Sequence, residues 1–123
     1  MSDDTRLVHL NALPSYQEAV IRPEKLREYS LNPTSTVGRH KARKFRSVLG
    51  FDQSNWELLS QSILSELPYH EAIFKQEDEH GKRYTVILPI TGPNGVTAEV
   101  LTGWILEPGS DRPRLTTARV LTK

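Results

Sequence analysis

The sequence predicts a single α+β domain in which about three N-terminal helices pack on a four-stranded antiparallel sheet. Helical spacing of apolar residues ends at Pro68, and alternation of apolar and polar residues begins near Glu71 and continues almost to the C-terminus. The length of 123 residues suits one domain with one hydrophobic core. We expect residues 1–13 to form a weakly ordered lead-in and residues 14–123 to form the domain.

Three helices are expected before Pro68. The first begins at Pro23, a residue suited to the first helical turn, and ends before Asn32. The second covers residues 39–49 and ends at Gly50, because glycine commonly follows a helix C-terminus. The third begins with a capping box at residues 54–57, Ser-Asn-Trp-Glu. Its apolar stripe is Trp56, Leu59, Ile63 and Leu67.

The strands follow from alternation and from turn residues. The segment Gly92-Pro93-Asn94-Gly95 is a strong hairpin signal between two alternating segments. A second turn at residues 108–111 precedes a last strand from about Arg114 to Leu121. The alternating apolar residues before and after the hairpin are Tyr84, Val86, Leu88, Ile90, Val96, Ala98 and Val100.

Composition excludes several classes of function. The chain has no cysteine, which removes disulfides, thiolate zinc sites, iron–sulfur clusters and thiol nucleophiles. The four histidines are scattered without ligand spacing, so we expect no metal, and no cofactor motif is present. No apolar stretch is long enough to span a membrane, and the acidic start is unlike a signal peptide. We therefore expect a cytoplasmic protein without membrane partners.

The charges are distributed unevenly. The net charge is only +1, yet no acidic residue occurs between Tyr29 and Phe51. That window holds five basic residues, so eleven remain elsewhere against all 15 acidic ones, and the rest of the chain has a net charge of −4. The five are Arg39, Lys41, Arg43, Lys44 and Arg46. This window is the one local cationic feature of the sequence.

The basic helix is the first candidate site. Exposed Arg39, Lys41, Arg43 and Lys44 could bind phosphates, and His40 adds a group that titrates near neutrality and could transfer a proton. The alternative is a solvated helix face without a ligand. Idle faces usually mix charges of both signs, and this helix has no acidic partner at helical spacing.

Residues of the last two strands form the second candidate site. Thr102 and Trp104 share one side of a strand, so a hydroxyl could bond a phosphate while an indole stacks on a base. Burial of Trp104 in the core is the alternative. The last strand offers Arg114, and it places Thr117 and Arg119 on one face, where they could also bind phosphate.

Several motifs carry a family resemblance across about Pro14 to Val120. They are Gly38-Arg39-His40-Lys41-Ala42, Thr91-Gly92-Pro93-Asn94-Gly95, Thr102-Gly103-Trp104-Ile105 and Pro113-Arg114-Leu115. With them the chain resembles a family of small bacterial proteins described as a domain of unknown function. Its architecture also resembles the ribonuclease toxin superfamily of barnase, EndoU-type toxins, colicin nucleases and RelE-like interferases. That resemblance implies a metal-free site on the sheet and an adjoining helix.

The leading hypothesis is a metal-independent endoribonuclease, the toxin of a toxin–antitoxin or contact-dependent system. Its partners would be RNA and an acidic antitoxin or immunity protein. His40, Lys41, Thr102 and Thr117 would be catalytic, and Arg39, Arg43, Lys44, Trp104, Arg114 and Arg119 would bind RNA. The alternatives are a basic helix that binds nucleic acid without cleaving it and one that docks an acidic protein.

Overall fold

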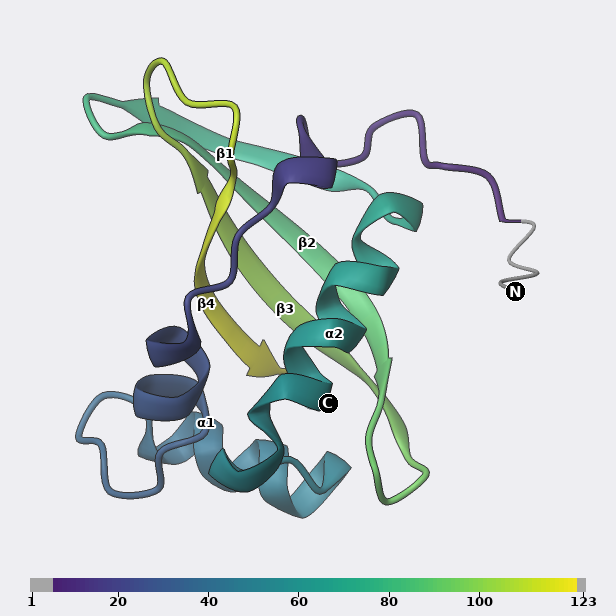
Figure 1. The fold of residues 1–123 in the computed structure, drawn as a ribbon, viewed down its shortest axis with the longest axis vertical. Coiled ribbons are helices and arrows are strands. Elements are labelled where there is room, and N and C mark those ends of the chain that lie inside the picture. Colours follow the sequence, from purple (N-terminus) through teal and green to yellow (C-terminus); the bar gives the residue numbers. More distant parts are fainter. Residues whose placement is uncertain (1–5, 122–123) are drawn as a thin grey trace.

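The computed structural model describes residues 6–121 and confirms an α+β architecture with a four-stranded antiparallel sheet. Helical elements precede all four strands along the chain (Figure 1). The helical elements are η1 (Tyr16–Glu18), η2 (Lys25–Ser30), α1 (Arg39–Lys44), η3 (Phe45–Leu49), η4 (Gln53–Asn55), α2 (Trp56–Glu66) and η5 (Leu67–Tyr69). The strands are β1 (Ala72–Asp78), β2 (Gly81–Thr91), β3 (Thr97–Leu106) and β4 (Arg114–Val120).

The sheet is a meander in the order β1-β2-β3-β4, so each strand pairs with its neighbour in sequence. The predicted hairpin turn is confirmed: Gly95 N–H donates to Gly92 O at 3.0 Å and Gly92 N–H to Val96 O at 2.9 Å. Between β3 and β4 the register shifts after Gly103, which pairs with Thr117 while Trp104 pairs with Leu115. This bulge leaves Thr116 without a directly opposite residue and bends β4 locally.

One face of the sheet carries the core. Val86, Leu88 and Ile90 of β2 alternate inward, as the sequence predicts, and are at most 1% exposed. Helix α2 crosses this face, where it buries Leu59 and Ile63 (Figure 1). Helices α1 and η3 lie at the end of the sheet where β4 stops and pack against β4. The expectation that the helices share one sheet face is therefore met in full only by α2.

The second predicted helix is confirmed as α1 followed directly by η3, whose turns are π-helical. Ala42, Phe45 and Leu49 are buried along its inner side. Gly50 ends it in the left-handed conformation, with φ of 83°, as expected of glycine after a helix. The first predicted helix is also present, as helical residues from Pro23 that continue through η2.

The predicted capping box at residues 54–57 is wrong. Asp52 is the N-cap, and its carboxylate accepts from Ser54 N–H at 2.8 Å. Asn55 completes the box by accepting from Asp52 N–H through Oδ1 at 2.8 Å. The turn η4 therefore begins two residues earlier than the Ser54 signal indicates, and it leads into α2 at Trp56.

Residues 6–13 run along the body of the protein. His9 N–H donates to Pro68 O at 3.0 Å, Ala72 N–H donates to Asn11 O at 2.8 Å, and Leu13 is buried in the core. The first five residues of the expected lead-in lie outside the described part of the chain. Within residues 6–121, no helix is long and apolar enough to cross a membrane.

Candidate functional site

The site is built around a contact between the basic helix and the last strand. Because α1 packs against β4, Lys41 reaches the strand and its ammonium Nζ donates to Thr117 Oγ1 at 2.7 Å. Thr117 pairs with Gly103, so its side chain stands on the sheet face opposite the core. Arg119, two residues further along the strand, stands on that same outer face and is exposed. The sequence prediction that Thr117 and Arg119 share a face is confirmed.

The surroundings of Lys41 disfavour its positive charge. Partial burial lowers the pKa of its ammonium, and the nearby cations Arg119 and Lys25 lower it further. The Lys25 ammonium also lies 5.6 Å from the centroid of the Tyr29 ring. Lys25 of η2 and Arg119 of β4 thus lie near the Lys41 ammonium, and Lys41 itself contacts the Thr117 hydroxyl. A bound anion would relieve the repulsion among these cations.

A hollow of about 410 Å³ lies on the outer face of the sheet, and Thr116, the neighbour of Thr117, is among its lining residues. The strand register places Thr85, Gly103 and Thr117 in one row across β2, β3 and β4. Arg83 stands beside this row and lines the hollow together with Thr116 of the bulge. The Arg83 Nε atom is buried without a hydrogen-bond partner and lies 3.5 Å from Asp78 Oδ2. Its guanidinium is therefore an incompletely satisfied donor at the edge of the hollow.

Gly103 keeps the middle of this row open. A Cβ added there would lie 2.9 Å from Thr117 Cγ2 and 3.0 Å from Thr116 Oγ1, which is tighter than normal packing permits. Any side chain at this position would therefore push on the two threonines and fill the hollow. The register shift places a bulge beside Gly103.

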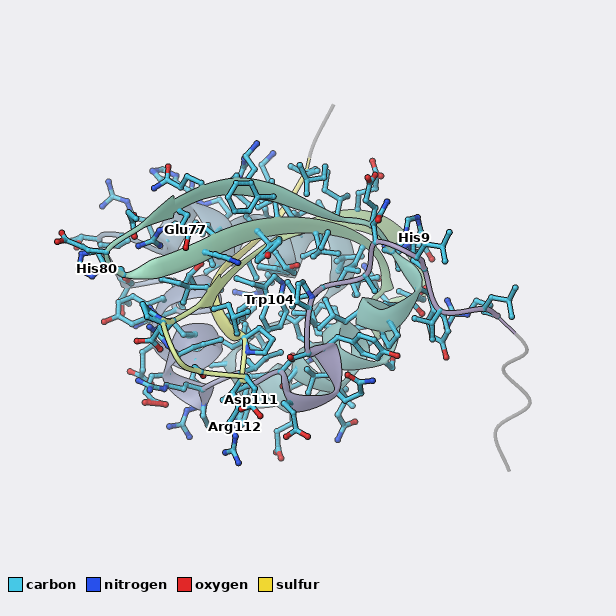
Figure 2. The ribbon with its side chains drawn as sticks, turned by 90° about the horizontal axis from the view of Figure 1, so that it is seen from above. His9, Glu77, His80, Trp104, Asp111 and Arg112 are labelled. Carbon is cyan, nitrogen blue, oxygen red and sulfur yellow. The ribbon has the colours of Figure 1, made fainter. Side chains whose placement is uncertain are left out.

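The Thr102 and Trp104 side chains lie outside the row of Thr85, Gly103 and Thr117, although Trp104 is also among the residues that line the hollow. Trp104 is 1% exposed and Thr102 is fully buried, because both lie on the core side of β3. The indole Nε1–H donates to Thr102 Oγ1 at 2.8 Å, and that hydroxyl donates to Val86 O at 2.7 Å. Figure 2 shows Trp104 near the middle of the molecule, with Asp111 and Arg112 at its periphery. Neither side chain can reach RNA in this structure, so the roles predicted for them are corrected to structural ones.

The other predicted residues fall on different surfaces. His40 and Lys44 are exposed on the solvent side of α1, whereas Lys41 faces β4. Arg39 and Arg43 line a cavity on the opposite flank of the helix from Lys41. Arg114 is paired instead, with its Nε 3.4 Å from Glu107 Oε1. The structure thus brings together Lys41, Thr117 and Arg119, and it separates them from the remaining predicted residues.

Sequence reasoning missed Lys25, Arg83 and Thr85. Their positions depend on the register across three strands and on the packing of η2. The hairpin turn does carry part of this signal, because it pairs Ile90 with Ala98 and, counting back, Thr85 with Gly103. The bulge that sets Thr117 opposite Gly103 has no comparable turn signal.

Two of the sequence motifs, residues 38–42 and 91–95, hold the basic helix in place. A Cβ on Gly38 would lie 1.8 Å from Tyr29 O, so only glycine permits the close packing of η2 against the start of α1. Gly92 approaches Leu49 O in the same way, with a Cβ distance of 1.9 Å. Asn94 adds a hydrogen bond from Nδ2 to Val48 O at 3.0 Å. These contacts fix the helix between η2 and the hairpin, and so fix where Lys41 points.

Comparisons with known proteins identify one similar structure and one family. A chain of the contact-dependent growth inhibition toxin–immunity protein complex from Klebsiella pneumoniae 342 matches with a TM-score of 0.66 at 14% identity. The match covers 90% of this chain and all of that one, which shows a shared fold. No curated protein sequence matches the chain. The family model described as a domain of unknown function, DUF6883, matches residues 12–122, and the chain therefore belongs to the DUF6883 family.

Proposed function

We propose that this chain is the toxin domain of a growth-inhibition or toxin–antitoxin system and that it cleaves RNA without a metal ion. The observation that carries the proposal is the Lys41–Thr117 contact of 2.7 Å beside Arg119 and Lys25. The fold shared with a chain of a toxin–immunity complex supports the toxin role. The excess of cations at the site supports a polyanionic substrate rather than an apolar one.

The chemistry assigned to the site is transesterification within RNA. The 2′-hydroxyl loses its proton and its oxygen attacks the adjacent phosphorus. The bond from phosphorus to the 5′-oxygen then breaks, and that oxygen takes up a proton. The products are a 2′,3′-cyclic phosphate and a 5′-hydroxyl end. No co-reactant is needed, because the nucleophile belongs to the substrate.

Three side chains are assigned to the reacting phosphate. The Lys41 ammonium and the Arg119 guanidinium stabilise the charge that grows on the non-bridging oxygens, and the Thr117 hydroxyl donates a hydrogen bond to one of them. Burial and neighbouring cations weaken the hold of Lys41 on its proton, which makes it a better hydrogen-bond donor to a phosphate. The proton transfer at the 2′-oxygen is assigned to His40, which lies outside the Lys41–Thr117 cluster on the solvent side of α1 and would have to meet the substrate from there.

The test is expression of wild type, Lys41→Gln and Lys82→Gln in a bacterium, followed by gel analysis of total RNA. Lys82→Gln is the matched control because it removes one positive charge from an exposed position on the β1–β2 hairpin. We expect growth arrest and RNA fragments with wild type and the control. We expect Lys41→Gln to lose about a hundredfold to a thousandfold in cleavage rate, as for loss of one transition-state donor.

The same experiment separates the alternatives. Purified wild-type protein that binds RNA without cutting it would support a nucleic-acid-binding module. Neither binding nor cleavage would favour a domain whose basic helix docks an acidic protein. His40→Ala tests the proton-transfer role independently, and a loss of about a hundredfold to ten-thousandfold in rate is expected. Full activity in His40→Ala with loss in Lys41→Gln would move that role to another group.

A further inference from the structure

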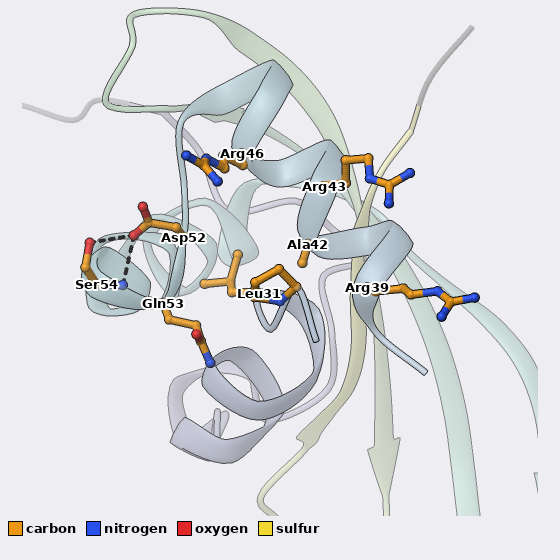
Figure 3. Close-up of a pocket in the computed structure, with 9 residues that line it drawn as sticks. Leu31, Arg39, Ala42, Arg43, Arg46, Asp52, Gln53 and Ser54 are labelled. Carbon is orange, nitrogen blue, oxygen red and sulfur yellow. Dashed lines mark hydrogen bonds between the residues drawn. The ribbon is translucent and has the colours of Figure 1, made fainter. Parts of the chain in front are cut away.

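A second cavity lies on the flank of the basic helix that faces away from Lys41. Its volume is about 450 Å³, within the range of ligand pockets in proteins. Leu31, Pro33 and Ala42 form an apolar part of its wall, and Asp52, Gln53 and Ser54 form a polar part (Figure 3). Leu31 and Ala42 belong to the apolar interior and are 1% and 4% exposed. The cavity thus combines a firm apolar wall with polar groups beside it.

Three arginines of the helix line the same cavity. Arg39, Arg43 and Arg46 follow one another at spacings of four and three residues, so they succeed one another along one side of the helix. All three are exposed, and Figure 3 shows Arg46 pointing toward Asp52 and the other two pointing away from it. Lys41 lies about 160° around the helix from both Arg39 and Arg43, so the arginines and Lys41 occupy separate flanks. The row offers phosphate-binding groups on successive turns at the mouth of an apolar cavity.

Asp52 supplies an acceptor next to these donors. Its Oδ1 accepts both the N–H and the hydroxyl of Ser54 (Figure 3). The Asp52 side chain also accepts the Asn55 N–H of the capping box, and the positive charge of Arg46 acts on it. A carboxylate can accept further hydrogen bonds from a ligand beside these. Those hydrogen bonds lower the pKa of the Asp52 carboxyl, so the group is ionised at neutral pH. An ionised carboxylate here disfavours the carboxylates of an acidic peptide. It favours a ligand that presents an amino group.

We propose that this cavity binds one nucleotide of an RNA substrate. The base would lie at the apolar wall that exposed Pro33 forms with buried Leu31 and Ala42, its exocyclic amino group on Asp52 and its phosphate on Arg43. Cytosine, adenine and guanine carry such an amino group, and uracil does not. The cavity therefore prefers the three amino-bearing bases over uracil. The inference rests on the proposed function only in taking RNA as the source of the nucleotide.

The experiment uses free mononucleotides, so it requires no cleavage. CMP and UMP are titrated separately into the full chain labelled at the methyl groups of Leu31 and Ala42, and chemical shifts are followed by NMR. Inorganic phosphate and a Glu-rich peptide are the comparison probes. CMP should shift both methyl groups saturably, because a base ring would lie against them. UMP should bind about tenfold to a hundredfold more weakly, the loss expected for one hydrogen bond to a charged group.

Three variants sharpen the result. Arg43→Gln should weaken CMP binding about tenfold or more, because it removes a charge-assisted contact to phosphate. Arg112→Gln removes the same charge from an exposed loop residue outside the cavity and should bind CMP as wild type does. Asp52→Asn keeps an N-cap residue and should abolish the preference for CMP over UMP. Folding of each variant is checked by its unfolding midpoint.

Several outcomes would overturn the proposal. Methyl shifts of equal size with inorganic phosphate would show an anion site without a base pocket. Shifts with the acidic peptide alone would show a protein-docking surface instead. Absence of shifts with CMP while the wild type cleaves RNA would reject the pocket and leave the nuclease standing. CMP binding by a chain that cleaves no RNA would reject the nuclease and leave the pocket standing.

Discussion

Replacing Thr102 by valine is expected to destabilise the fold strongly without touching the proposed site. Valine has nearly the shape of threonine, but it cannot accept from the Trp104 indole N–H or donate to Val86 O, contacts of 2.8 and 2.7 Å. The indole is 1% exposed, so its N–H would be left away from bulk solvent. A buried donor left without a partner costs about 1–3 kcal/mol, and the lost bond to Val86 adds to it.

The expected total is about 2–3 kcal/mol of unfolding free energy. For a chain of 123 residues the unfolding entropy is about 0.26 kcal/mol/K near 60 °C, so the midpoint should fall by about 8–12 °C. Calorimetry or circular dichroism measures this shift. Thr102→Ser keeps both hydrogen bonds and loses one methyl group, so it should cost only about 1 kcal/mol.

A double-mutant cycle with Trp104→Phe isolates the hydrogen bond. Phenylalanine has no N–H, so Thr102→Val should cost about 1–2 kcal/mol less in that background than in wild type. Additive effects, or an unchanged midpoint for Thr102→Val alone, would refute the structural role assigned to this pair. RNA cleavage by Thr102→Ser should match wild type, because the hydroxyl is buried away from the outer face of the sheet.

Three further outcomes are expected. Lys41→Met should be more stable than wild type, by an amount that shrinks as pH rises toward 10.5. The lowered pKa of Lys41 costs stability only while its ammonium is charged. Urea unfolding midpoints of both proteins at pH 7 and pH 10 measure this difference. Asp52→Ala should cost about 1 kcal/mol at pH 7 through loss of the N-cap, and the gap from wild type should close as acid protonates Asp52, whose pKa is lowered by Ser54. Gly103→Ala should lower both the thermal midpoint and RNA cleavage, because its Cβ would press on Thr117, and unchanged cleavage would separate the hollow from the site.

The fold was predictable where local chemistry and periodicity agree. The alternation of Val86, Leu88 and Ile90 and the glycine-rich turn after them predict the β2–β3 hairpin, and the structure has it. The capping box was misplaced because Ser54 and Asp52 are both good N-cap residues, and their local patterns alone do not rank them. In the structure Asp52 is the N-cap residue, and Asn55 completes the capping box.

The candidate site was predictable only in part, because it depends on which sheet face is covered. Alternation correctly places Thr102 and Trp104 on one side of β3, but it does not say that this side is the core. The turn fixes Val86 opposite Thr102, and residues that pair across strands share a sheet face. Because Val86 is one of the alternating apolar residues that form the core, this register indicates that Thr102 and Trp104 face the core. Thr117 and Arg119 were placed correctly together because strand period alone sets their common face.

The basic residues between positions 39 and 46 form one cationic segment of the sequence, but in the folded chain they lie on two different surfaces. A helix turns by about 100° per residue, so Lys41 and Arg43 point to different flanks although two positions separate them. Packing of Ala42 and Phe45 into the core fixes the rotation of the helix, and the edge strand β4 then receives Lys41. The arginines lie on the other flank, where Arg46 points toward Asp52 (Figure 3). Loss of Lys41 and loss of Arg43 should therefore impair different steps, the first the reaction at phosphate and the second the choice of the neighbouring base.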